Sequence, residues 1–143
     1  MDRIAIVYWS GRGATKQMAD YVKAGVEAAG KTADVYLARN FGKDLMPNYN
    51  KLAFGCPAMG NEELEPSEFE PMFREIEPYL PGKKVVLFGS YGWGDGEWMR
   101  DWTTRMEAAG ATVLNGEGLI CHETPDEDGL NACRELGRQL ADA

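Results

Sequence analysis

A glycine-rich loop near the start of the chain carries the residue types that bind phosphate. An apolar run over residues 3–8 ends in Trp9-Ser10-Gly11-Arg12-Gly13-Ala14-Thr15, where a helical pattern begins. Glycines let the backbone fold around an anion, and hydroxyls and the free N–H groups of a helix start bind it. The Gly-Lys-Ser/Thr ending of triphosphate loops is missing, and Lys16 stands where dinucleotide loops need Gly or Ala. The loop predicts a site for one phosphate group, with a glycine-rich turn capped by Thr15 as the alternative.

Two later loops carry groups that suit a flat aromatic ligand. They are Cys56-Pro57-Ala58-Met59-Gly60-Asn61-Glu62 and Ser90-Tyr91-Gly92-Trp93-Gly94-Asp95-Gly96-Glu97-Trp98. Dense glycines allow close backbone approach, and a ring between Met59 and Trp93 would be held by polarizable sulfur and by stacking. The alternative for Trp93 is packing over the strand ends, while Trp98 is expected in the core. A phosphate in the first loop and an aromatic ring between the other two describe a mononucleotide.

These loops are positioned by strands and helices that alternate along the chain. Helices are predicted over residues 15–29, 67–79, 97–109 and from Thr124 to the C-terminus, with Ser67 and the box Thr124-Pro125-Asp126-Glu127 as start signals. Buried strands are predicted over residues 3–8, 33–37, 51–56 and 85–90, with a fifth broken by Asn115-Gly116 into residues 112–114 and 119–121. Such alternation predicts an α/β fold in three layers, a doubly wound parallel sheet with helices on both faces. Ligands then bind at the carboxyl ends of the strands.

Composition narrows the possible classes of protein. The 143 residues suit one domain, 1–143, and no apolar run approaches the roughly 18 residues that span a bilayer. The net charge of −8 argues against nucleic acid and anionic membranes as partners. Three scattered cysteines and one histidine argue against a disulfide framework and a metal site. We therefore expect a cytoplasmic monomer.

An acidic run over residues 61–77 contains seven Glu and one Arg. A solvated face is one interpretation of this run, and a docking surface for a basic partner is the other.

Four segments of the chain resemble the flavodoxins, in particular the short-chain clostridial type. The segments are Val7-Tyr8-Trp9-Ser10-Gly11, Cys56-Pro57-Ala58-Met59-Gly60, Glu68-Phe69-Glu70-Pro71 and the stretch from Lys83 to Met99. The resemblance covers essentially the whole chain. It implies the five-stranded sheet order 2-1-3-4-5, which the flavodoxin family itself exemplifies, and it implies bound FMN.

The resemblance also implies roles for particular residues in holding FMN. Ser10, Gly11, Gly13 and Thr15, with Ser90, would hold the phosphate, and Met59 and Trp93 would cover the two faces of the flavin. The Gly60–Asn61 peptide would face flavin N5, and Glu62 would bind the pyrimidine edge with the Gly92 backbone nearby. The full expected set is Ser10, Gly11, Arg12, Gly13, Ala14, Thr15, Pro57, Ala58, Met59, Gly60, Asn61, Glu62, Ser90, Tyr91, Gly92, Trp93 and Gly94. None of them is catalytic, because the cofactor performs the chemistry.

Three positions depart from the pattern of the family, two in the first loop and one in the second. Arg12 and Ala14 stand where the family usually has Thr and Asn, so the loop loses two polar side chains and gains a cation. We expect Arg12 to point to solvent. Asn61 replaces the common Asp, Ser or Gly, and it is expected to adopt a positive φ as the third residue of a Met59–Glu62 turn.

The function implied is that of a low-potential one-electron carrier, a ferredoxin substitute that uses the semiquinone/hydroquinone couple of FMN. Its partners would be basic-surfaced redox enzymes that dock on an acidic face around the flavin. The alternative is an FMN-dependent quinone or NAD(P)H reductase on the same fold, although Trp93 would block the ring face that such substrates need. A phosphoacceptor domain would need a carboxylate near the end of the third strand, where the chain has Cys56.

Overall fold

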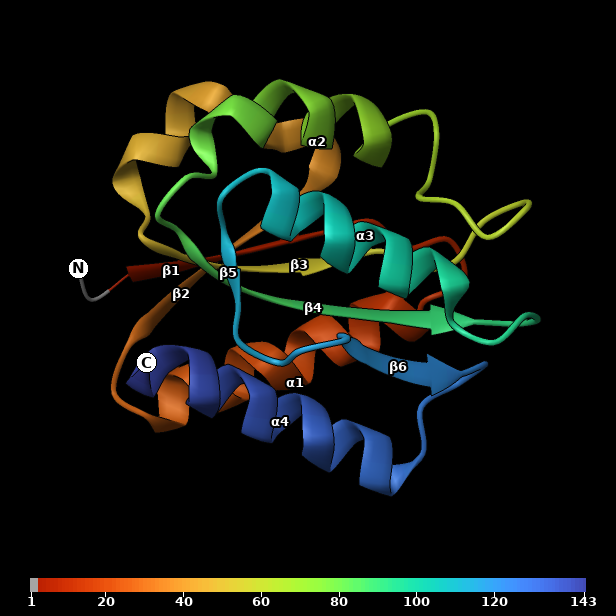
Figure 1. Ribbon diagram of the computed structural model, residues 1–143. Coiled ribbons are helices and arrows are strands. Elements are labelled where there is room, and N and C mark those ends of the chain that lie inside the picture. Colours follow the sequence, from red (N-terminus) through yellow and green to blue (C-terminus); the bar gives the residue numbers. More distant parts are fainter. Residues whose placement is uncertain (1–2) are drawn as a thin grey trace.

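One parallel sheet forms the centre of the computed structural model, which describes residues 3–143 (Figure 1). The strand order is β2-β1-β3-β4-β5, with β6 also paired to β4. The strands are β1 (Arg3–Tyr8), β2 (Thr32–Leu37), β3 (Lys51–Gly55), β4 (Lys84–Tyr91), β5 (Thr112–Val113) and β6 (Leu119–His122). The order and the parallel pairing confirm the predicted fold class, to which the structure adds the sixth strand.

Helices cover both faces of this sheet, α1 with α4 on one and α2 with α3 on the other (Figure 1). The α-helices are α1 (Ala14–Ala28), α2 (Phe69–Ile76), α3 (Glu97–Ala108) and α4 (Glu127–Asp142). Short 3₁₀ helices are η1 (Ala38–Asn40), η2 (Lys43–Asn48) and η3 (Glu77–Tyr79). Within residues 3–143 no helix is long and apolar enough to cross a membrane.

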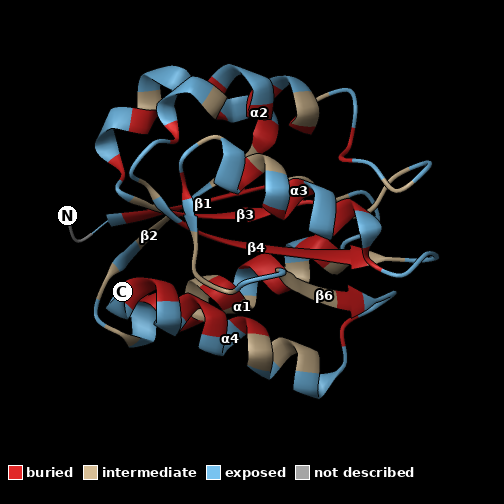
Figure 2. Ribbon diagram, viewed as in Figure 1, coloured by how far each residue is buried: buried red, intermediate tan, exposed pale blue. Residues whose placement is uncertain are grey.

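The core consists of two apolar layers, one on each side of the sheet. Alternate residues of β1 supply opposite layers: Ala5 and Val7 face α2 and α3, while Ile4 and Ile6 face α1 and α4. The central strands are buried almost throughout, as Figure 2 shows in red, and the loops at their carboxyl ends are largely exposed. Burial on both faces explains why the strand sequences are continuous apolar runs.

The fifth strand is broken as predicted, and the side chain of Asn115 bridges the gap. Asn115 Oδ1 accepts a hydrogen bond from Leu87 N at 3.2 Å, and its Nδ2 donates to Leu87 O at 2.9 Å. Leu87 lies in β4 between the residues that pair with β5 and those that pair with β6. The side-chain amide of Asn115 therefore supplies the hydrogen bonds that a neighbouring strand would otherwise make to Leu87.

Two predicted helix start signals are wrong. The hydroxyl of Ser67 does not cap α2; it donates to the carboxylate of Glu65, which in turn accepts hydrogen bonds from Glu68 N and Phe69 N at 2.7 and 2.9 Å. The final helix is capped by Asp126 rather than Thr124, because Asp126 Oδ1 accepts from Gly129 N at 2.8 Å. A carboxylate also suits the positive end of a helix better than a hydroxyl does.

Candidate functional site

Three loops meet at the carboxyl edge of the sheet, where the sequence placed a ligand. They follow β1, β3 and β4, which are neighbours in the sheet (Figure 1). Ala58 N donates to Ser90 O at 3.0 Å and joins the second loop to the third. The hydroxyls of Thr15 and Ser90 lie 2.9 Å apart and join the first loop to the third. The structure therefore brings together the three loops that the sequence singled out.

The first loop forms an exposed cradle over the start of α1. Gly13 occupies the N-cap with a φ of 100°, and no side chain caps the helix from that position. Ser10 Oγ accepts from Gly13 N and from Lys16 N, both at 3.2 Å. Thr15 is buried beneath, with its hydroxyl on Ser90. Free amides of the first helical turn above two hydroxyls are a donor set that suits an oxyanion.

The two unusual residues of this loop play no polar part in the structure. Arg12 is exposed and makes no hydrogen bond or ion pair with any residue from 3 to 143. Ala14 begins α1 and is partly buried, and Gly11 packs near the ring of Trp9, where a Cβ would lie 3.1 Å from the indole. The donors of the cradle are therefore backbone amides and hydroxyls rather than the guanidinium.

The second loop turns one residue later than predicted. Met59 and Glu63 exchange two backbone hydrogen bonds of 2.9 Å, so the turn comprises Gly60, Asn61 and Glu62. Positive φ values occur at Gly60 (50°) and Glu62 (55°), and the prediction of a positive φ at Asn61 is wrong. The Met59–Glu63 pairing widens the turn and moves the left-handed position to Glu62.

Glu62 connects the second loop to the third at the rim of the site. Its Oε1 accepts a hydrogen bond from Asp95 N at 3.0 Å. Gly94, with a φ of 87°, makes room for this contact, since a Cβ there would lie 1.6 Å from the same oxygen. The carboxylate of Asp95 pairs with Arg100 at 3.0 Å. Asp95 was not among the residues expected to hold FMN. Its position between Gly94 and Gly96 in the third loop was the feature of the sequence that could have indicated it.

The aromatic residues of the third loop separate into one exposed and one buried side chain. Trp93 is 61% exposed, so it does not pack down over the strand ends. Trp98 is 1% exposed and donates its Nε1 hydrogen to Cys56 O at 3.2 Å, which confirms the core assignment. Tyr91 packs against Trp98, and Gly92 has open space around its Cα. An exposed indole beside open backbone is available to stack on a ligand.

The remaining expected residues lie in the same loops. Pro57, Ala58 and Met59 are partly buried, and Gly60 and Asn61 are exposed. Sequence reasoning missed His122 in β6. Its Nε2 lies 3.2 Å from Gly92 O and so connects β6 to the third loop. Only the pairing of β6 with β4 reveals that contact.

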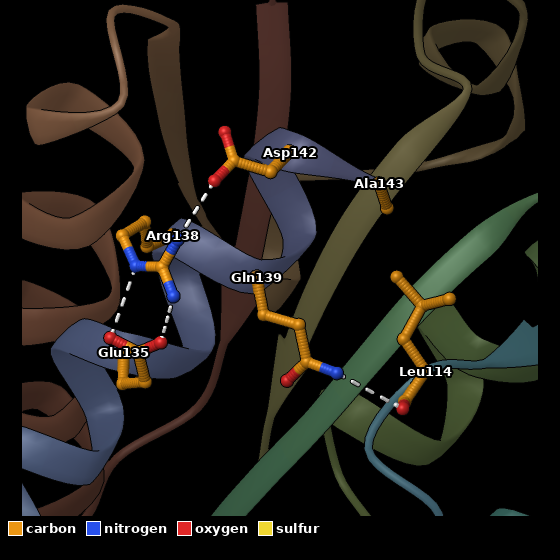
Figure 3. Close-up of a pocket in the computed structure, with 6 residues that line it drawn as sticks. All are labelled: Leu114, Glu135, Arg138, Gln139, Asp142 and Ala143. Carbon is orange, nitrogen blue, oxygen red and sulfur yellow. Dashed lines mark hydrogen bonds and ion pairs between the residues drawn. The ribbon is translucent and has the colours of Figure 1, made fainter.

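Two cavities lie away from these loops. One, of about 350 Å³, is lined by α4 residues and Leu114, and Figure 3 shows that Arg138 is held there by Glu135 and Asp142. The other, of about 370 Å³, lies at the amino-terminal ends of β1, β3 and β4 among Arg3, Asn50, Lys51, Gly82 and Lys84. No group of three or more His, Cys, Asp or Glu within residues 3–143 is arranged to hold a metal ion.

The chain is similar to known proteins over nearly its whole length. The family model described as Flavodoxin matches residues 6–137. The chain is 46% identical over 140 residues to the flavodoxin of Megasphaera elsdenii, covering 98% of this chain and 99% of that protein. It is 46% identical over 136 residues to the flavodoxin of Clostridium beijerinckii, covering 95% and 97%. The solution structure of two-electron reduced Megasphaera elsdenii flavodoxin superposes with a TM-score of 0.87 at 45% identity, covering 98% and 99%.

Proposed function

The chain belongs to the flavodoxin family, and from that premise we propose that it carries single electrons at low potential between redox enzymes, using bound FMN. Flavodoxins are electron-transfer proteins rather than enzymes, so the reductase alternative is not retained. The observation that supports this proposal most directly is the convergence of a phosphate-type cradle and an exposed Trp93 on one edge of the sheet.

The first loop fits the phosphate of FMN. Backbone amides of residues 11–15 and the hydroxyls of Ser10, Thr15 and Ser90 would hold it, at the positive end of the α1 dipole. Thr15 and Ser90 already share one hydrogen bond, so each hydroxyl is oriented before the phosphate arrives. Ala14 contributes only its backbone amide, and Arg12 adds a positive charge from solvent.

The other two loops fit the ring of FMN, which supplies one-electron chemistry when bound. Trp93 would stack on one face and Met59 on the other, with Pro57, Ala58, Tyr91 and Gly94 completing the walls. Glu62 uses Oε1 for Asp95 N, which leaves Oε2 for the imide N–H of the ring. The Gly60–Asn61 peptide would lie at the edge of the ring that changes protonation. A backbone carbonyl there can accept a hydrogen bond from that edge when it is protonated.

The surrounding acids would hold the potential low. A negative charge about 12 Å from the ring, at an effective dielectric near 40, disfavours adding an electron by about 0.7 kcal/mol, or about 30 mV. The structure restricts which acids contribute, since Glu65 is buried on the α2 start and Glu70 is paired with Arg105. The exposed acids in or next to the rim loops are Glu63, Asp95, Glu97 and Asp101, of which Asp95 is paired with Arg100.

We place the partners on this acidic rim. Basic-surfaced redox enzymes would be steered to it, so their electron-transfer rates should fall as ionic strength rises. Rates that are flat or rise with salt would contradict electrostatic docking. We also propose a cytoplasmic location, because the three buried cysteines form no disulfide, and a monomeric state.

Binding of FMN and riboflavin to the flavin-free protein tests the proposed function. Tryptophan fluorescence should fall as one FMN binds per chain, and riboflavin should bind much more weakly because it lacks the phosphate that the cradle holds. Trp93→Phe should reduce the quenching, since Trp93 is the most exposed of the four tryptophans, whereas Trp9 is half-buried and Trp98 and Trp102 lie in the core. Equal affinities for FMN and riboflavin would refute the phosphate site.

A further inference from the structure

Two buried cysteines meet between β6 and α4, outside the residues assigned to FMN. Cys121 in β6 is 8% exposed and Cys133 in α4 is fully buried. Cys121 Sγ lies against the face of α4 that carries Gly129 and Cys133, and both cysteines belong to the same apolar layer. We propose that Cys121 and Cys133 are a redox-active dithiol, which is oxidised to an intramolecular disulfide by exchange with a low-molecular-weight disulfide.

The packing of α4 on β6 brings the two cysteines close together. Gly129 and Cys133 are four residues apart on α4 and therefore share one helix face. Cys121 Sγ lies against that face, because a Cβ at Gly129 would be 2.9 Å from it. Both cysteines belong to the apolar layer between the sheet and α1 with α4. The dithiol is thus held by regular secondary structure on both sides.

The two thiols differ in accessibility, and that difference assigns the order of reaction. Cys121 is 8% exposed and lies on an edge strand, where local opening is easiest, whereas Cys133 is fully buried. The neighbouring Cys133 thiol also lowers the pKa of Cys121, although burial opposes it. Cys121 is therefore the attacking thiol and Cys133 the resolving one.

The exchange proceeds in two balanced steps. The thiolate of Cys121 attacks one sulfur of the small disulfide, forms a mixed disulfide and releases one small thiolate. The sulfur of Cys133 then attacks Cys121 Sγ, its proton passes to solvent, and the second small thiolate leaves. The two cysteines lose two electrons, and the small disulfide is reduced to two thiols.

The position of the pair next to the cradle gives the oxidation a structural consequence. Cys121 is the register partner of Ser90, whose hydroxyl contacts Thr15. A disulfide would tie the strand beside Ser90 to α4. The chemistry of the pair itself does not rest on the roles proposed for FMN.

Cys56 provides an internal control for the reaction. It lies in the other apolar layer, accepts a hydrogen bond from Glu65 N at 3.4 Å, and burial raises the pKa of its thiol. We expect Cys56 to stay reduced while the pair reacts.

The test treats the folded, FMN-saturated protein with oxidised glutathione and counts its thiols by mass spectrometry after alkylation. Free thiols should fall from three to one, and peptide mapping should link Cys121 to Cys133 in one chain. Cys56→Ser should form the same disulfide. In Cys133→Ser the reaction should stop at the glutathione adduct of Cys121. Cys133→Ala should stop at the same adduct and replaces Cys133→Ser if it folds better.

Three results would overturn the proposal. They are persistence of all three thiols in the folded wild-type protein, a disulfide that includes Cys56, and failure of both Cys133 variants to acquire glutathione on Cys121.

Discussion

Replacing Gly94 with alanine should weaken FMN binding by about 30- to 150-fold, because it separates two of the three loops at the rim. The added Cβ would lie 1.6 Å from Glu62 Oε1. That oxygen is the end of a flexible side chain, so Glu62 swings away rather than forcing the backbone apart. The variant therefore loses the hydrogen bond from Asp95 N to Glu62 and acquires backbone strain at residue 94.

The magnitude follows from these two costs. Gly94 has a φ of 87°, and an L side chain in the left-handed region costs about 1–2 kcal/mol. A hydrogen bond to a carboxylate contributes about 1.5–3 kcal/mol when buried, which we reduce to about 1 kcal/mol because Asp95 is exposed. The two costs sum to about 2–3 kcal/mol against the ordered conformation of the loop. If FMN binds only to that conformation, the affinity for FMN falls tenfold for about every 1.4 kcal/mol, which gives about 30- to 150-fold.

The assay is a fluorescence titration of the flavin-free variant with FMN, alongside Gly82→Ala as a matched control. Gly82 also has a positive φ, of 81°, a Cβ added to it would meet no atom within 4 Å, and it precedes β4 at the opposite edge of the sheet from the three loops, so its substitution should change FMN affinity little. In a double-mutant cycle with Glu62→Ala, the two costs should be less than additive, because both variants lose the same hydrogen bond. Equal FMN affinities for Gly94→Ala and Gly82→Ala, or full additivity in the cycle, would refute the reasoning.

Three further predictions concern one side chain each. Arg12→Thr should weaken FMN binding modestly and mainly at low salt, because Arg12 is exposed and unpaired within residues 3–143. Arg138→Thr on α4 is the control. A loss of FMN binding free energy above about 2 kcal/mol relative to that control would mean that Arg12 contacts the phosphate directly. Burial of Glu65 disfavours its charge, but its hydrogen bonds outweigh burial and hold its pKa below the ordinary value. The stability that this carboxylate contributes is therefore present above about pH 4.3 and is lost as the pH falls through the lowered pKa, so the urea midpoints of wild type and Glu65→Gln should converge in acid. Asn115→Leu should lower the free energy of unfolding by about 2–3 kcal/mol, because it leaves Leu87 N–H and C=O without partners; an unchanged urea midpoint would contradict the bridging role.

The sequence was sufficient for the architecture and for the meeting of the three candidate loops at one edge of the sheet. Strands buried on both faces must be continuous apolar runs, and β1 begins and ends where its run does. The loops that follow parallel strands lie at one edge of the sheet, so the sequence alone predicted that the loops after β1, β3 and β4 lie close together. Trp93 and Trp98 were also separated correctly, because a helix position close to a strand end predicts burial and a position between loop glycines does not.

The tertiary structure alone decided the contacts that depend on two distant segments. Glu65 rather than Ser67 supplies the acceptor for α2, because a longer carboxylate reaches back over the turn to several amides at once. The Met59–Glu63 pairing sets which residue of the second loop takes a positive φ, and local turn preference could not anticipate it. Asn115 and the Cys121–Cys133 pair owe their partners to the way β5, β6 and α4 pack against β4. Residue type and spacing determine which chemistry is available along the chain, whereas the partner of each side chain is set by packing between elements far apart in sequence.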